Sequence, residues 1–191
     1  PSKWGFGFEF FSGYAMLTKE LKTAFTNPVP IGVAFDISYK KFALFLRDYI
    51  GFSKTKTAIP YSNGTWEKNS QVRVFLPEAS LGYVVLDNKI LKMIPFAGYA
   101  GTAFLPTDND EEKNPDLKKA GLAFTNTFTT GLNLDIKLGL SKREGVSFHE
   151  ESYGFLRLRY GYTQSQFQKR YHGYQGSMHY ITIGIGGFGR A

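Results

Sequence analysis

Apolar and polar residues alternate along several segments of the chain, most regularly between residues 122 and 141. One parity of this segment is mostly apolar, and the other carries mostly Thr, Gly, Asn and charged side chains. A period of two is the period of a β-strand, whose successive side chains point to opposite faces. Strands of soluble sheets usually have about 5–6 residues, whereas a tilted membrane-spanning strand needs about 9–11. The segment is therefore long enough to cross a membrane and continue beyond it.

The same alternation predicts eight strands in a single domain, residues 1–191. We expect the strands over residues 4–12, 31–39, 42–52, 72–86, 90–104, 122–141, 153–163 and 178–188. Pro77 and Pro95 lie inside the fourth and fifth of these ranges. Because proline cannot donate to the strand ladder, each needs a bulge or a position without a ladder bond.

The connections between these strands alternate in length. Long connections are expected near residues 13–30, 54–71, 105–121 and 164–177, short ones near 40–41 and 87–89, and an intermediate one near 141–152. Residues 17–25 have the pattern of a short amphipathic helix, and residues 108–119 form a charged, solvated stretch. Long loops on one side and short turns on the other are typical of an up-and-down outer-membrane barrel.

Two barrel architectures fit this alternation. In a soluble calycin-like barrel the apolar face lines a cavity that carries an apolar ligand, whereas in a membrane barrel the apolar face meets lipid. The polar face here is rich in Gly, Ala, Ser and Thr, which suits the crowded lumen of an eight-stranded barrel. The membrane barrel is therefore favoured, and the soluble carrier stays open as an alternative.

Positive and negative charges on the polar face are equal in number. They are Glu9, Asp36, Glu78, Asp135, Arg47, Lys137, Arg157 and Arg159. Buried charges must be paired because an isolated one is costly, and equal numbers of both signs make pairing possible. We predict that these residues form an ion-pair network in the lumen.

Composition and net charge limit the classes of molecule that the protein is expected to bind. The chain has no Cys, which excludes disulfides and thiolate metal sites, and its net charge is +7. No dense Lys/Arg run or nucleic-acid motif accompanies this charge, so anionic lipid head groups are the expected partners and nucleic acid is not. No apolar stretch reaches the about 18 residues of a transmembrane helix. Aromatic content of 17% and 21 Gly residues suit a barrel.

The glycine-spaced aromatic opening WGFGFEFFSGY and the ending HYITIGIGGFGRA carry a resemblance to a known class. The chain resembles the small eight-stranded outer-membrane β-barrels of Gram-negative bacteria, which include the OmpA and OmpX barrels, and looks most like barrels of the Bacteroidota. The resemblance implies an all-β, closed, antiparallel, up-and-down transmembrane barrel in the bacterial outer membrane. Such barrels usually end on an aromatic residue, whereas three residues follow Phe188 here, so we expect a trimmed chain or a different assembly signal.

Ser177 and His179 are the candidate catalytic residues. They are two positions apart, so they share a strand face with the apolar Ile181, Ile183 and Ile185. Outer-membrane phospholipases and lipid A deacylases place a Ser/His pair at such a position, although in the order His-x-Ser. A nucleophile also needs an orienting partner for its base, and Gln164 is the nearest polar candidate. An interfacial Ser and His without catalytic function is the alternative.

Two further clusters contain histidine. His149, Glu150 and Glu151 are consecutive, and consecutive residues rarely converge on one metal ion, so we predict no metal site. Lys169, Arg170 and His172 form a basic cluster around Tyr171. This cluster suits contact with the phosphates of lipopolysaccharide, and a solvated loop is the alternative.

The sequence thus predicts an outer-membrane barrel with a side-chain-filled lumen and a structural or surface-binding role. In that role the barrel could be a subunit of a larger envelope complex. The first alternative is an outer-leaflet lipid-modifying enzyme of the deacylase or phospholipase kind. The second is the soluble carrier. Expected partners are outer-membrane lipid, lipopolysaccharide and a protein of an envelope complex, and no cofactor is expected.

Overall fold

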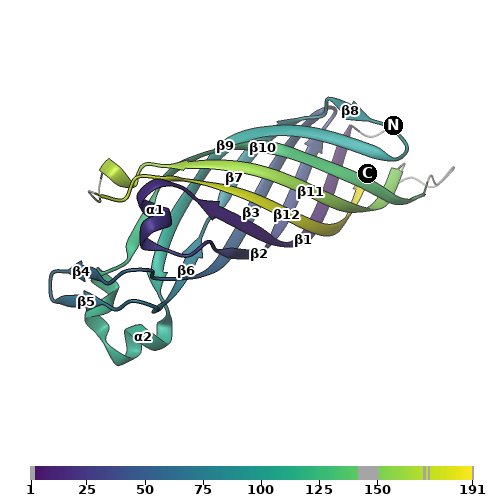
Figure 1. The fold of residues 1–191 in the computed structure, drawn as a ribbon. Helices are drawn as coiled ribbons and strands as arrows, with labels where there is room; N and C mark the ends of the chain where they lie inside the picture. The colour runs from purple at the N-terminus through teal and green to yellow at the C-terminus, as the bar shows by residue number, and fades with distance from the viewer. Residues whose placement is uncertain (1–2, 142–150, 170, 172, 191) are drawn as a thin grey trace.

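A computed structural model describes residues 3–141, 151–169, 171 and 173–190 of the chain (Figure 1). The strands are β1 (Trp4–Leu17), β2 (Val29–Tyr39), β3 (Phe42–Lys54), β4 (Ile59–Tyr61), β5 (Gly64–Trp66), β6 (Gln71–Phe75), β7 (Glu78–Tyr83), β8 (Leu86–Asp87), β9 (Leu91–Pro106), β10 (Leu122–Ser141), β11 (Glu151–Ser165) and β12 (Ser177–Arg190). The helical segments are α1 (Lys19–Ala24), α2 (Asp108–Lys113), η1 (Pro115–Lys119) and η2 (Phe167–Lys169).

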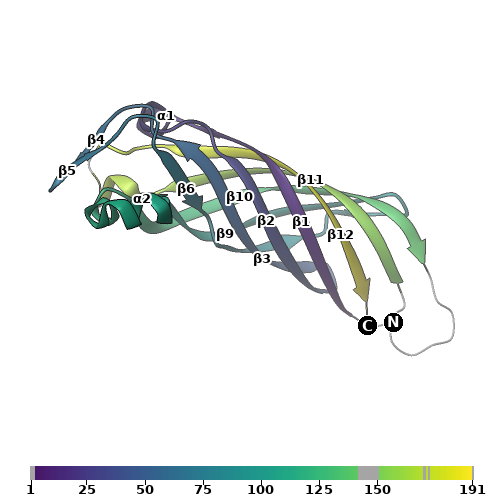
Figure 2. The ribbon, with the colours of Figure 1, turned by 90° about the horizontal axis from the view of Figure 1, so that it is seen from below.

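Antiparallel pairing closes the sheet into a barrel. β1 pairs with β2 on one side and with β12 on the other, and the ring continues through β11, β10 and β9 to β6, β7 and β3. β6 and β7 together make one strand of the wall, which therefore has eight strands. Figures 1 and 2 show the strands slanting around this single barrel. The predicted closed, eight-stranded, antiparallel, up-and-down barrel is confirmed.

The fourth predicted strand is interrupted at Leu76 and Pro77. β6 and β7 pair with β3 in one continuous register, because Phe75 lies opposite Ile50 and Glu78 lies opposite Arg47. Pro77 has no N–H to donate, but its carbonyl still accepts a hydrogen bond from the Gly101 amide at 3.0 Å. The break is therefore a local loss of ladder bonds without a change of register.

The long and short connections lie at opposite ends of the barrel. α1, the β4–β5 hairpin and α2 lie at one end, here named the loop end, whereas both termini and β8 lie at the other, the short-turn end (Figures 1 and 2). The amphipathic helix predicted over residues 17–25 forms as α1, with Leu21 and Ala24 buried. The charged stretch 108–119 is solvated as predicted, and it folds into α2 and η1. The intermediate link falls mainly on residues 142–150, outside the described part of the chain.

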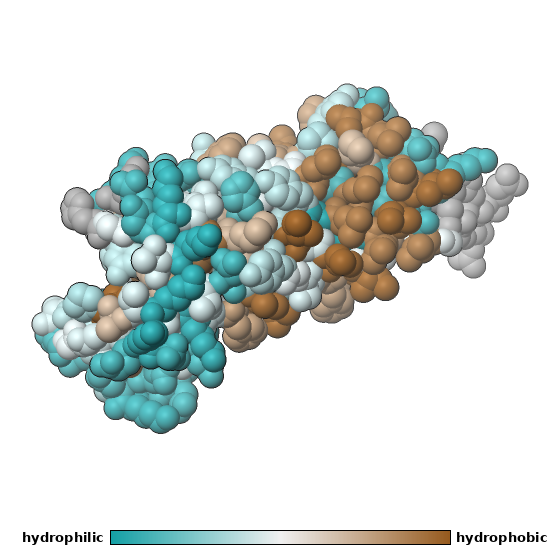
Figure 3. Space-filling model, viewed as in Figure 1, coloured by the Kyte–Doolittle hydropathy of each residue, from teal (hydrophilic) through white to brown (hydrophobic). Residues whose placement is uncertain are grey.

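Apolar side chains face outward from the wall. On β12, Ile181, Ile183 and Ile185 are 52–62% exposed, whereas the intervening Thr182 is fully buried. Figure 3 shows hydrophobic residues over the wall toward the short-turn end and hydrophilic residues over the loop end. A soluble carrier would need the opposite arrangement, with its apolar face inside. The wall is therefore that of a membrane-spanning barrel.

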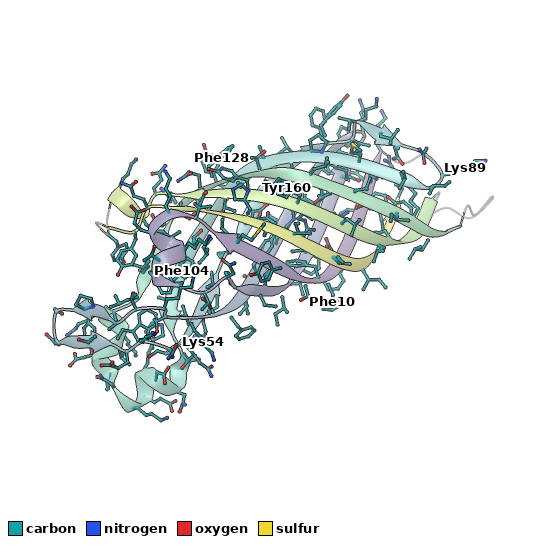
Figure 4. The ribbon with its side chains drawn as sticks, viewed as in Figure 1. Phe10, Lys54, Lys89, Phe104, Phe128 and Tyr160 are labelled. Atoms are coloured by element: carbon teal, nitrogen blue, oxygen red, sulfur yellow. The ribbon has the colours of Figure 1, made fainter. Side chains whose placement is uncertain are left out.

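Buried side chains inside the barrel differ along its axis. A large apolar cluster lies toward the loop end and includes Leu21, Phe25, Trp66, Phe104 and Phe167, with Phe25 stacked on Phe104 at a ring distance of 4.6 Å. Figure 4 labels Phe104 beside the loop end. Two smaller clusters contain Phe45 with Phe96 and Tyr153 with Phe188. In the described part of the chain, no helix is both long enough and apolar enough to cross a membrane.

Candidate functional site

Arg157 is the centre of a buried charge cluster inside the barrel. Its guanidinium contacts three carboxylates, with Nη1 2.9 Å from Glu9 Oε2, Nη2 2.7 Å from Asp36 Oδ2 and Nε 2.5 Å from Asp135 Oδ1. These acids come from β1, β2 and β10, while Arg157 comes from β11. The alternation of each strand points all four side chains inward. The cluster therefore ties together strands that are distant in sequence.

Arg159 extends the cluster by one layer. Its Nη2 lies 2.5 Å from Glu9 Oε2, so Glu9 accepts from both arginines. Arg159 Nε donates to Asn133 Oδ1 at 2.9 Å, and Nη1 donates to Thr182 Oγ1 at 3.2 Å. Hydrogen bonds that engage ionised groups are stronger than neutral ones. Three nitrogen atoms of the Arg159 guanidinium thus have side-chain partners.

Arg47 and Glu78 form a second buried pair. They are directly opposite on β3 and β7, and Arg47 Nη1 donates to Glu78 Oε1 and, at 3.0 Å, to Ser80 Oγ. The Arg47 guanidinium lies 4.3 Å from the ring centres of both Phe45 and Phe96. Two aromatic faces stabilise a cation in this position.

A chain of hydroxyl groups leads from this pair toward the loop end. The Tyr180 hydroxyl donates to Glu78 Oε2 at 3.3 Å, and the Tyr49 hydroxyl donates to that of Tyr180 at 3.3 Å. Neither tyrosine is among the predicted site residues. Both lie on strand positions whose parity predicts an inward-facing side chain.

Two lysines lie nearer the short-turn end. Lys137, a predicted network residue, has its Nζ 2.6 Å from Asp87 Oδ1 of β8. Lys92 is 2% exposed, donates to the Tyr153 hydroxyl at 3.3 Å and lies 4.1 Å from the Phe188 ring centre. Lys92 and Asp87 are not among the predicted site residues, although Lys92 shares the inward parity of Gly98, Ala100 and Thr102.

Ser177 and His179 have separate partners. Ser177 is buried, and its Oγ is 2.9 Å from Thr18 Oγ1 at the start of α1. His179 is partly exposed, its Nδ1 is 2.8 Å from the Tyr160 hydroxyl, and its ring packs on Tyr162 at 4.9 Å. In the described part of the chain no hydrogen bond joins Ser177 to His179. Figure 4 labels Tyr160 on β11.

The structure describes only some residues of the other two candidate clusters. Lys169 ends η2 at the loop end and is exposed, whereas Arg170 and His172 lie outside the described residues. His149 and Glu150 also lie outside them. Over residues 3–141, 151–169, 171 and 173–190, no group of three or more His, Cys, Asp or Glu side chains is arranged to hold a metal ion.

Solved structures share this fold. Neisserial surface protein A matches with a TM-score of 0.54 and 10% identity over 97% of this chain and 96% of that one. OprG of Pseudomonas aeruginosa matches with a TM-score of 0.54 and 10% identity over 100% and 96% of the two chains. Ail of Yersinia pestis, in complex with the heparin analogue sucrose octasulfate, matches with a TM-score of 0.51 and 7% identity over 97% of each chain.

No family model matches the chain, and neither does any curated protein. The solved neighbours give no support to a resemblance with Bacteroidota barrels in particular. Identities of 7–10% show the fold alone. With its apolar outer wall, the fold identifies the chain as a small β-barrel of the bacterial outer membrane.

Proposed function

We propose that the protein is an outer-membrane barrel whose lumen is filled by side chains and whose function is binding at the loop end. The observation that carries the proposal is the Arg157 cluster, in which one guanidinium contacts Glu9, Asp36 and Asp135 inside the barrel. The apolar cluster around Phe25 and Phe104 lies toward the loop end. Side chains can fill the interior of an eight-stranded barrel. Transport through the lumen is therefore disfavoured.

Contacts between loops support a preformed surface. Thr18 bonds to Ser177, Lys56 Nζ donates to the Lys22 carbonyl at 2.8 Å, and Asn63 Nδ2 donates to Asp116 Oδ1 at 3.3 Å. These contacts connect the first loop with the last and the second, and the second with the third. A surface that is ordered before binding loses less conformational entropy on binding.

Phosphate groups of lipopolysaccharide are the proposed ligand. Lys19, Lys22, Lys54 and Lys169 are exposed at the loop end, and Figure 4 labels Lys54 there. Arg170 and His172 follow Lys169 in sequence and add to the same basic segment. Ail, a protein of the same fold, was solved in complex with the heparin analogue sucrose octasulfate, and this supports the proposal of a polyanionic ligand. Lysine contacts phosphate as a point charge, so binding weakens as salt rises.

The test compares lipopolysaccharide binding by the purified barrel and its variants. Lys169→Ala with Arg170→Ala is expected to weaken binding of phosphorylated lipopolysaccharide, and dephosphorylated lipopolysaccharide is expected to bind weakly to every form. Lys89→Ala is the matched control, because Lys89 is exposed at the short-turn end (Figure 4). Equal loss in the control, or equal binding of the dephosphorylated form, would reject phosphate recognition at the loop end.

A further inference from the structure

Asp48 is an anomaly on the lipid-facing wall. It points outward from β3 between Leu46 and Ile50. Among outward-facing wall positions whose side chains the structure describes, it carries the one carboxylate. Ionisable residues inside a membrane are costly and usually mark a site. Asp48 therefore needs an explanation other than packing against lipid.

The position of Asp48 along β3 is well inside the apolar band. It lies six residues after Phe42 and four before Phe52, and both of these phenylalanines are more than half exposed. At about 3.3 Å per residue the carboxylate is roughly 13–20 Å along the strand from each. A head group at either membrane surface is thus a distant partner. No described side chain of the barrel hydrogen-bonds to this carboxylate.

Two hollows in the outer wall meet at Asp48. The first, of about 530 Å³, has a lining that includes Val33, Phe35, Leu46, Pro77, Ala79 and Tyr99. The second, of about 340 Å³, is lined by Phe10, Ile31, Val33 and Ile50. Their volumes are in the range of small-molecule sites, about 300–1,000 Å³. The first hollow lies where Pro77 interrupts the wall between β6 and β7 and where Ala79 and Ala100 are small.

Aromatic rings line the same two hollows as Asp48. Tyr99 is 72% exposed and Phe35 is 53% exposed, and both line the first hollow. Phe10, labelled on the wall in Figure 4, lines the second. A carboxylate next to aromatic faces is complementary to an ammonium group, which is attracted both to the negative charge and to the ring faces. Apolar walls on both sides suit a hydrocarbon body.

The geometry points to a binding site for an apolar amine on the outer wall, with the amine nitrogen at Asp48 and the hydrocarbon body in the two hollows. The site is separate from the loop end, so it is independent of lipopolysaccharide binding. A neutral lipid chain can fill the hollows but leaves the carboxylate without a donor. A second protein copy docked on this face is the competing occupant, and the test distinguishes it.

The test uses photoreactive labelling in phosphatidylcholine nanodiscs. The probe is dodecylamine that carries a diazirine, and the matched neutral probe is the corresponding dodecanol. We expect amine labelling to concentrate on residues of the hollows, such as Val33 and Ala79, and to be competed by unlabelled dodecylamine. Asp48→Asn is expected to weaken the amine about tenfold or more, as removal of a charged hydrogen bond predicts.

Two further variants keep the test decisive. Ala79→Phe keeps the carboxylate, fills the first hollow and is also expected to weaken labelling. Glu20→Gln removes an exposed acid from α1 and is expected to leave labelling unchanged. Folding of each variant is checked by its heat-dependent gel mobility. Equal labelling by the alcohol, unchanged labelling in Asp48→Asn, or a protein dimer that disappears in Asp48→Asn would overturn the proposal.

Discussion

At the scale of single residues, the balance of charge at Arg157 is the strongest constraint on the interior. One cation contacts three carboxylates, and Arg159 adds a second cation through its contact with Glu9. Taking charges out of water is expensive, so such a cluster need not add to stability when complete. Removal of one member leaves uncompensated buried charges. Arg157 is therefore the most sensitive residue of the cluster.

Arg157→Leu is expected to lower the free energy of unfolding by about 3–5 kcal/mol, because Glu9, Asp36 and Asp135 lose their shared partner. Urea unfolding of the barrel in lipid measures the change. Arg157→Lys should also destabilise, since an ammonium group cannot reproduce the fork of the guanidinium. Lys89→Leu serves as the exposed control, with an expected change within about 0.5 kcal/mol. An unchanged midpoint for Arg157→Leu would show that the cluster is not coupled to stability.

Ser177→Ala tests the enzyme hypothesis at the same scale. Ser177 Oγ bonds to Thr18 rather than His179, so we expect no release of fatty acid from phospholipid or lipid A by the native protein. The substitution should instead cost about 0.5–1.5 kcal/mol of unfolding free energy through the lost hydrogen bond. Fatty-acid release that disappears in Ser177→Ala would establish an enzymatic role.

At the scale of elements, the alternation of apolar and polar residues predicts the strands of the wall wherever their inward face is polar. β1 was expected to end at residue 12 but continues to Leu17, because Ala15 and Leu17 join the buried apolar cluster while Tyr14 and Met16 are exposed. Both faces are apolar there, so the alternation disappears although the strand continues. The β4–β5 hairpin was missed for a related reason, since each strand has three residues and is too short for a period to be read.

The partners of the inward charges were less predictable than their direction. Parity assigns a face to each residue, but the pairing across the barrel depends on register and shear, which the pattern does not contain. The meeting of Glu9 with Arg157, 148 positions apart in the chain, could thus not be deduced. The inward direction of Lys92, by contrast, is predictable, because Lys92 has the same parity as Gly98, Ala100 and Thr102.

Leu134→Arg tests the membrane contact of β10. Leu134 shares the outward parity of Leu132 and lies opposite Met93 and Leu158 on the neighbouring strands. A cation on this face is expected to cost about 2–4 kcal/mol near the bilayer midplane, as measured by reversible unfolding in lipid. Gln71→Arg, at the loop-end start of β6, should cost close to nothing because the penalty depends on depth. Similar costs for both substitutions would contradict the placement of β10 in the membrane.

At the scale of the whole molecule, the protein combines an apolar wall with a charged and aromatic interior. The wall fixes the location of the protein in the membrane. The interior determines whether the barrel is a conduit or a support for its loops. Our proposal assigns the function to the loops, and it therefore depends on the absence of a continuous water path between the two ends.

Conductance in a planar lipid bilayer measures whether such a water path exists. The purified barrel is reconstituted, and its insertion is verified by protease protection of the wall. We predict no steady single-channel current across the membrane at any moderate voltage, because Arg157, Arg159 and Arg47 occupy the interior together with their acidic partners. Stable, ohmic current steps from the verified native protein would show a continuous water-filled path and would contradict the account.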